Sequence, residues 1–194
     1  MGHKQKSLWS VNSYHLIMLT ELFKTKERVR IISYILYHKS LTVNQVSNET
    51  GITKGLVSRY LKYVHGVGLF TKTKNIYQLI DCAHTRAIKL LLNLNKINIK
   101  SLDIDWTTGI GIFGSWAQGT NTYESDLDLW VKVDAYPAEY QLARLQRDIS
   151  AMAGLEVNML VLTPEKMKSI KMADQPFYNS LLRTSIVLKG GSIE

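Results

Sequence analysis

The sequence predicts a mixed α/β (α+β) protein built from two domains, on three observations. Charge is divided unevenly: residues 1–100 hold 16 Lys/Arg and 4 Asp/Glu, a net of +12, and residues 101–194 hold 8 and 12, a net of −4. The basic half shows short helical segments followed by a β-hairpin pattern, and the other half alternates strands with helices. This contrast indicates two domains with different partners, the basic one facing a polyanion.

Helix start and stop signals organise the basic half. Thr25, Thr42 and Thr53 each precede an apolar-periodic segment and are suitable N-caps, and Gly51 is a suitable helix end. Residues 69–80 consist of two short segments joined by a polar, basic turn, which is typical of two short strands. The predicted elements are a basic lead over residues 1–7, helices over 15–23, 26–38, 43–50 and 54–65, and a hairpin over 69–80.

Three helices followed by a hairpin resemble a winged helix-turn-helix domain, which we place over residues 1–82. The turn at Gly51 between the second and third helices fits the helix-turn-helix spacing. The resemblance implies that the third helix enters the major groove of double-stranded DNA and that the hairpin follows the backbone. Any one of the polar residues there is equally explained by a solvated surface, but their grouping in this basic half favours DNA contact. The expected DNA-binding residues are Lys54, Ser58, Arg59, Lys62, Lys72 and Lys74.

Residues 83–106 are predicted to connect the two domains, as a helix followed by a loop of mixed composition. The helix could link the domains or mediate dimerisation, and both interpretations remain open. Winged-helix proteins frequently dimerise to bind two half-sites, so we expect a homodimer. The apolar face expected for this helix consists of Ile88, Leu91, Leu92 and Leu94.

The acidic half, residues 107–194, predicts a small mixed β-sheet with flanking helices. A glycine-rich strand runs into a Gly-Ser turn, and a second apolar strand follows after a polar loop. Pro137, Pro164 and Pro176 each stand where a helix can begin, because proline at the first helical position loses no hydrogen bond. The predicted order is strands over 110–113 and 126–133, a helix over 137–153, a strand over 155–162, helices from 164 and over 177–183, and a strand over 185–188.

The second of these strands begins with two carboxylates, Asp126 and Asp128. Successive strand residues alternate faces, so both side chains point the same way. Like charges held that close repel unless a cation lies between them or one of them is neutralised. Two hard oxygen donors suit Mg²⁺ together with substrate phosphates. Gly114 and Ser115 complement such a site, because glycine lets the backbone approach a phosphate and the N–H groups opening a helical turn favour an anion.

These residues resemble the signature of the DNA polymerase β-type nucleotidyltransferase superfamily, and in particular its minimal prokaryotic branch. The match consists of Gly114-Ser115-x-Ala117-x-Gly119 followed by Ser125-Asp126-x-Asp128-Leu129. The resemblance implies that the Gly-Ser turn holds a nucleoside triphosphate, which we expect to be ATP, and that the aspartates bind the Mg²⁺ that activates nucleotide transfer. The implied nucleotide-binding residues are Gly114, Ser115, Gly119 and Ser125, and the implied catalytic and metal-binding residues are Asp126 and Asp128.

The third strand departs from the family pattern. Members usually carry a third carboxylate just ahead of a Thr-Pro-Glu, and alignment on Thr163-Pro164-Glu165 places Asn158 at that position. Glu156 lies two residues earlier, hence on the same strand face and roughly 7 Å away by strand rise. Asparagine can offer a carbonyl oxygen to a cation, but it cannot act as a base. Three outcomes stay open: Glu156 serves as the catalytic carboxylate, Asn158 serves as a metal ligand at a reduced rate, or the site binds nucleotide without turnover.

The predicted function is Mg²⁺-dependent transfer of a nucleoside monophosphate to a hydroxyl acceptor, with the basic domain directing the protein to DNA. The alternative is a DNA-binding regulator or antitoxin whose nucleotidyltransferase-like domain only binds nucleotide or a partner protein. The family resemblance adds a toxin-like protein as a candidate acceptor. No apolar run approaches the ~18 residues of a membrane helix. A lone cysteine, Cys82, fits the reducing, cytoplasmic setting that we expect.

Overall fold

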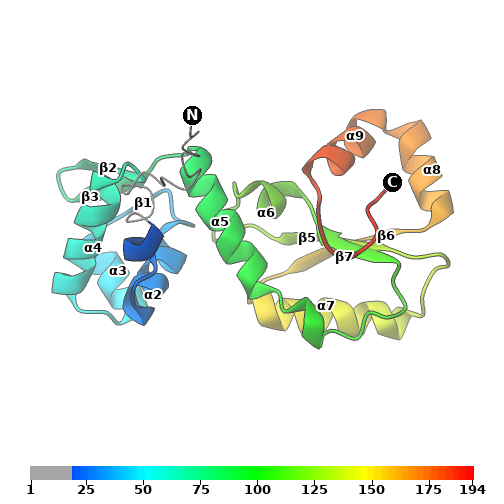
Figure 1. Ribbon diagram of the computed structural model, residues 1–194, viewed down its shortest axis with the longest axis horizontal. Coiled ribbons are helices and arrows are strands. Elements are labelled where there is room, and N and C mark those ends of the chain that lie inside the picture. The colour runs from blue at the N-terminus through cyan, green and yellow to red at the C-terminus, as the bar shows by residue number, and fades with distance from the viewer. Residues whose placement is uncertain (1–18) are drawn as a thin grey trace, which may run out of the picture. The chain divides into compact units, whose positions relative to one another are not determined.

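The computed structural model describes residues 19–194 and separates at Ile80/Asp81 into two compact units (Figure 1). The predicted basic lead and the start of the first predicted helix lie outside the described residues. Each unit combines helices with a sheet, which confirms the α+β class. Across residues 19–194, no helix has the length and apolar character needed to cross a bilayer.

The helices of the first unit begin where the sequence predicts, but the helix from Lys26 ends at Ile35 rather than at residue 38, and Thr53 makes no side-chain hydrogen bond as an N-cap. Thr25 and Thr42 each accept a hydrogen bond from a backbone N–H in the first turn of the helix that follows, and Thr42 completes a capping box with Gln45. Gly51 ends the second helix in the left-handed conformation, with φ of 68°. These helices are α2 (Lys26–Ile35), α3 (Val43–Thr50) and α4 (Lys54–Gly66).

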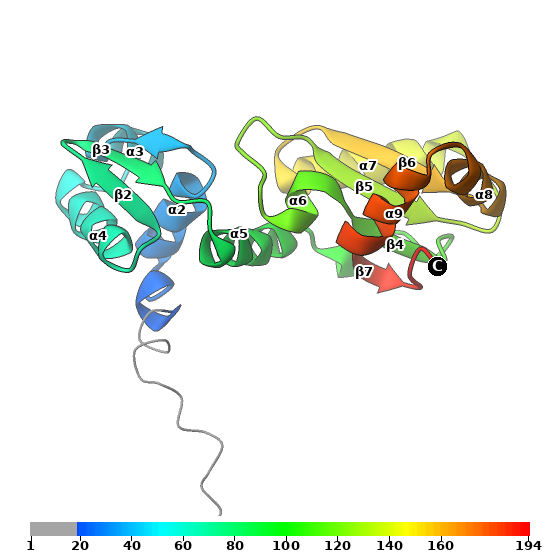
Figure 2. The same ribbon diagram turned by 90° about the horizontal axis from the view of Figure 1, so that it is seen from above.

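A three-stranded antiparallel sheet completes the first unit, in the order β1-β3-β2 (Figure 2). The predicted hairpin is confirmed as β2 (Phe70–Thr73) and β3 (Ile76–Leu79). Strand β1 (Ser40–Leu41) is too short to leave a periodic signal in the sequence. Fully buried residues of α2 and α4 form the core beneath the sheet, namely Ile31, Ile32, Ile35, Val57, Leu61 and Val64.

The second unit is a four-stranded mixed sheet in the order β6-β5-β4-β7. Strands β5 and β6 are parallel, and the other pairs are antiparallel. The elements are α5 (Ala83–Lys96), a short 3₁₀ helix (Ile99–Ser101), β4 (Gly109–Ile112), α6 (Gly114–Gln118), β5 (Leu127–Lys132), α7 (Glu139–Ala153), β6 (Val157–Leu162), α8 (Pro164–Ala173), α9 (Gln175–Thr184) and β7 (Ile186–Gly190).

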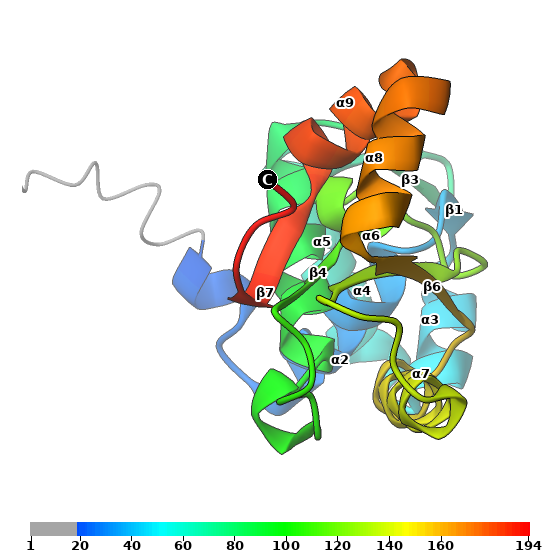
Figure 3. The same cartoon turned by 90° about the vertical axis from the view of Figure 1, so that its right-hand side faces the viewer.

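Helices cover both faces of this sheet, with α7 on one side and α8 and α9 on the other (Figure 3). Leu129 of β5 belongs to the same buried cluster as Ile149 of α7. Trp130, the next residue along β5, packs instead with Leu181 of α9. Because strand residues alternate faces, Asp128 lies on the side of α8 and α9.

Helix α5 packs within the second unit. Ile88 is buried as expected, but Leu91 is 49% exposed. The other buried side chains of α5 are polar: Thr85, Lys89 and Asn93. Lys89 and Asn93 turn inward because α6 and the loop after it supply their hydrogen-bond partners, whereas the Thr85 hydroxyl bonds Cys82 at the start of α5. The domain boundaries predicted from the sequence stay predictions.

Candidate functional site

The Gly-Ser turn directly follows β4 and opens α6. Gly114 has a φ of 65°, a backbone conformation that residues other than glycine rarely adopt. A Cβ placed on Gly114 would lie 2.5 Å from Oδ2 of Asp128, which is too close for any side chain. Ser115 follows, half-buried, as the second residue of α6. The structure therefore brings the predicted phosphate-binding turn against one of the two predicted metal ligands.

Asp126 and Asp128 converge with Asn158. Asp126 immediately precedes β5 and is exposed, whereas Asp128 lies within the strand and is half-buried. In the parallel pairing of β5 with β6, Asp128 is the direct partner of Asn158. Nδ2 of Asn158 lies 3.5 Å from Oδ2 of Asp126 and 3.5 Å from Oδ1 of Asp128. Two carboxylates and one amide thus share one face of the sheet edge.

The side-chain amide nitrogen of Asn158 faces both carboxylates. Its N–H groups face the negative oxygens and reduce their mutual repulsion. A half-turn of the amide exchanges its nitrogen for its oxygen, which could then coordinate a cation. The donor set of two carboxylates and one carbonyl oxygen suits a hard ion such as Mg²⁺.

Glu156, the other candidate for the third carboxylate, lies apart from this set. It is exposed, it precedes β6, and it lines the same surface pocket as Gln146 and Ser150 of α7. Within residues 19–194, no three His, Cys, Asp or Glu side chains are grouped closely enough to hold a metal ion. We placed Glu156 beside Asn158 by the alternation of strand faces, but that alternation begins only at Val157, the first residue of β6.

The loop between α6 and β5 holds the two remaining predicted nucleotide-binding residues. Gly119 ends α6 with φ of 65°, and a Cβ there would collide with the carbonyl of Arg86 in α5. The hydroxyl of Ser125 accepts a hydrogen bond of 2.9 Å from the backbone N–H of Thr122, which forms a turn just before Asp126. The sequence analysis missed the buried polar residues that support this loop: Lys89, Asn93 and Asn121.

The predicted DNA-binding residues form an exposed polar surface in the first unit. All six are exposed, and the buried residues of α4 face the other way, into the core. At the hairpin tip, Lys74 has a φ of 53°, which lets β2 turn directly into β3. The six are Lys54, Ser58, Arg59 and Lys62 on α4 and Lys72 and Lys74 on the hairpin.

A pocket of about 290 Å³ opens on this surface, between the start of α3, α4 and the hairpin. The ammonium of Lys72 lies 5.3 Å from the centroid of the Tyr77 ring, which holds it at the pocket. A helix N-terminus beside a lysine suits a phosphate group. The lining residues are Thr42, Val43, Asn44, Ser58, Lys72, Asn75 and Tyr77.

The candidate site lies in the second of two units, and each unit matches a known family model. The family model of the nucleotidyltransferase domain matches residues 94–183. The model described as bacterial regulatory protein, arsR family, matches residues 25–72. The two matches give the fused order that the sequence predicts, a helix-turn-helix domain followed by a nucleotidyltransferase domain. No curated protein matches the chain at a significant level.

Two solved structures illustrate what the chain is similar to. One is a toxin–antitoxin with AMP-PNP, at 20% identity and a TM-score of 0.34, with 57% of this chain and 75% of that chain covered. The other is a tri-AMPylated Shewanella oneidensis HEPN toxin in complex with an MNT antitoxin, at 21% identity and a TM-score of 0.35, covering 53% and 73%. These scores are too low to carry an argument about this chain.

Proposed function

We propose that this protein is a Mg²⁺-dependent nucleotidyltransferase that binds DNA through its winged helix. It would transfer a nucleoside monophosphate from a triphosphate, with ATP as the first candidate, to a hydroxyl group. The observation that carries the proposal is the approach of Asp128 to the Gly114 turn, where a Cβ would lie 2.5 Å from the carboxylate. A phosphate-binding backbone and a metal-binding carboxylate are thereby adjacent, as nucleotide transfer requires.

Each part of the site has a distinct task in this reaction. Backbone N–H groups at Gly114 and the hydroxyl of Ser115 would hold the triphosphate. Asp126 and Asp128 would hold Mg²⁺, which neutralises phosphate charge and orients the phosphate oxygens when bound. The acceptor oxygen would attack the α-phosphorus, so that a new O–P bond forms while the bond to pyrophosphate breaks. The hydroxyl proton would pass to solvent or to a carboxylate.

The residue at position 158, Asn158, would set the rate of turnover. Its 3.5 Å approach to both aspartates supports a role as a metal ligand through its carbonyl oxygen. A neutral amide cannot accept the proton of the attacking hydroxyl, so slow turnover or binding alone is consistent with this residue. Glu156 would have to move from its exposed position to replace it.

A DNA-binding regulator that senses nucleotide, or an antitoxin, is the second candidate function. The neutral Asn158 favours it, because the site keeps its phosphate turn and two aspartates without a third carboxylate. The pocket at Lys72 and the exposed residues of α4 support contact with double-stranded DNA. For either function, we propose a partner protein, with a toxin-like protein as the first candidate, and a homodimer.

Calorimetric titration with ATP, and then with the other nucleoside triphosphates, tests the proposal. We expect binding that depends on Mg²⁺ in the wild type and is lost in Asp126→Asn/Asp128→Asn, because the substitution removes both charges that hold the ion. The control is the DNA affinity of the same variant, which should be unchanged. Absence of binding for every nucleotide would contradict the proposal and leave the DNA-binding regulator. Loss of nucleotide and DNA binding together would indicate a collapsed fold.

A further inference from the structure

A buried polar cluster joins helix α5 to the loop after α6. Asn93 is 0% exposed and Asn121 is 1% exposed, and their side-chain amides form two reciprocal hydrogen bonds of 3.0 and 3.3 Å. Lys89, 6% exposed, donates to the backbone carbonyl of Asn121 at 2.8 Å. Burial lowers the pKa of the Lys89 ammonium. Each of these residues forms a hydrogen bond with another member of the cluster. Because a buried polar group without a partner destabilises the fold, loss of one member should destabilise the others.

The same cluster is tied to the Gly-Ser turn. Nδ2 of Asn93 also donates to the backbone carbonyl of Trp116, at 2.9 Å. The carbonyl of Ser115 accepts from the backbone N–H groups of Thr120, at 3.0 Å, and Asn121, at 3.3 Å. Asn121 is therefore fixed on one side to α5 and on the other side to the residue that follows Gly114.

The cluster also anchors the start of the aspartate segment. After Asn121, the Thr122–Ser125 turn leads to Asp126, and the N–H of Leu127 then joins the sheet through the carbonyl of Glu156, at 2.9 Å. Asp126 thus stands on a short loop whose two ends are fixed, one by Asn121 and one by β6.

We propose that Asn93, acting with Lys89 and Asn121, is a positioning residue that fixes the distance between the Gly114-Ser115 turn and Asp126. The inference rests on the proposed nucleotide site. Asn93 and Lys89 lie outside the residues 94–183 that match the nucleotidyltransferase domain. In this proposal, helix α5 contributes positioning residues to the site through its hydrogen bonds to Trp116 and Asn121. A metal bridging carboxylate and phosphate needs both groups at a set separation, so displacement of either weakens the bridge.

Asn93→Leu is the principal test, because leucine keeps a similar volume but leaves Asn121 and the Trp116 carbonyl without a donor. The matched control is Thr85→Ala, a buried polar residue of the same helix whose hydroxyl bonds Cys82 in the first turn.

The first readout is the factor by which Mg²⁺ increases ATP affinity. We expect Asn93→Leu to reduce this factor by about tenfold, while ATP binding without metal changes little, and we expect Thr85→Ala to keep most of it. A purely structural role would lower the melting temperature of Asn93→Leu and Thr85→Ala alike without changing the factor. That result would overturn the inference.

The second readout needs no ligand. Amide hydrogen exchange at Thr120 and Asn121 should accelerate in Asn93→Leu and stay slow in Thr85→Ala. Unchanged exchange would overturn the inference even if nucleotide binds. Accelerated exchange in a protein that binds no nucleotide would instead mean that the proposed function fails while the positioning of the loop is correct.

Discussion

Gly114 and Asp128 show how closely the candidate site is built. The glycine adopts a left-handed φ of 65° and leaves no space for a Cβ beside the Asp128 carboxylate. Any other residue would both strain the backbone and displace the aspartate. The residue types at these two positions are therefore coupled, since the carboxylate occupies the volume that a side chain at position 114 would take.

Asn158→Asp tests whether the third position limits the metal site. Without metal, a third negative charge beside Asp126 and Asp128 should destabilise the protein through like-charge repulsion. With Mg²⁺, the same charge should strengthen binding by about tenfold, or about 1.4 kcal/mol, and raise turnover. The measurement is the shift of the melting temperature by Mg²⁺, followed by release of pyrophosphate.

Asn158→Ala is the control for that experiment, because it removes the amide without adding charge. It should reduce the effect of Mg²⁺ below that of the wild type. If Asn158→Asp and Asn158→Ala respond to Mg²⁺ as the wild type does, the residue at position 158 takes no part in binding the ion.

Among the elements, the β2–β3 hairpin and α4 make the strongest case for DNA contact. Lys72→Ala/Lys74→Ala should weaken binding to duplex DNA of any sequence, because phosphate contacts carry no sequence information. Affinity for the wild type should fall steeply with salt, and the slope of log affinity against log salt should drop by about 2 in this variant. Fluorescence anisotropy over a salt series measures both quantities.

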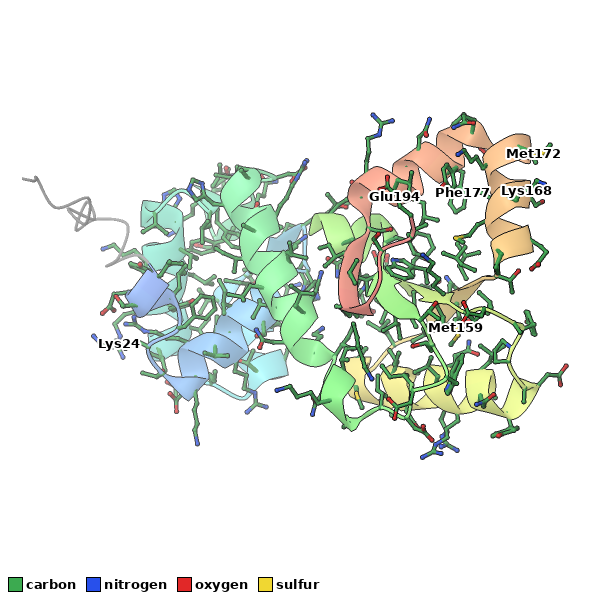
Figure 4. All side chains as sticks on the ribbon, turned by 45° about the vertical axis from the view of Figure 1, so that its right-hand side comes forward. Lys24, Met159, Lys168, Met172, Phe177 and Glu194 are labelled. Atoms are coloured by element: carbon green, nitrogen blue, oxygen red, sulfur yellow. The ribbon has the colours of Figure 1, made fainter. Side chains whose placement is uncertain are left out.

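The control replaces two lysines of the other unit, Lys166→Ala/Lys168→Ala, which changes net charge by the same amount. Lys168 lies on α8, as does Met172, while Phe177 lies on α9 (Figure 4). This variant should keep the wild-type slope. Equal slopes for all three proteins would mean that the hairpin makes no phosphate contact.

Local signals explain why the helices of the first unit could be predicted and the buried face of α5 could not. Thr25, Thr42 and Gly51 act within one turn of chain, so the sequence contains the information that places them. The inward turn of Asn93 depends on Asn121, which is distant in sequence, and a polar residue on a helix is ordinarily read as exposed.

The candidate site likewise contains residues that local sequence patterns predict and one that they do not. The Gly-Ser turn and Asp126-x-Asp128 are local patterns, and the structure brings Gly114 and Asp128 together. Asn158 could be placed from the strand pattern and its alignment, and its pairing with Asp128 agrees. Glu156 could not be placed, because β6 begins only after it and the face it points to depends on where the strand starts.

Across the whole molecule, the excess positive charge lies in the first of two compact units that meet in sequence at Ile80/Asp81: residues 1–80 hold 12 Lys/Arg and 3 Asp/Glu, a net of +9, and residues 81–194 hold 12 and 13, a net of −1. The N-terminal half carries the excess positive charge, which favours a polyanion, and the C-terminal half carries the carboxylates that would hold a cation. Each unit has its own sheet and its own buried core. Two separately built units are compatible with the two binding functions that we propose.

A pair of fragments tests where the nucleotide-binding unit begins. We expect residues 81–194 to fold and to bind ATP with Mg²⁺, because the fragment keeps α5 and its contacts to the loop after α6. Residues 107–194, the domain predicted from sequence, should be unstable. This shorter fragment would leave Asn121 and the Trp116 carbonyl without donors, at a cost of about 1–3 kcal/mol for each buried group, and would expose the surface that α5 covers. Circular dichroism melts and calorimetry compare the two fragments with the full chain. Equal stability and affinity of the two fragments would mean that α5 is not part of the nucleotide-binding unit.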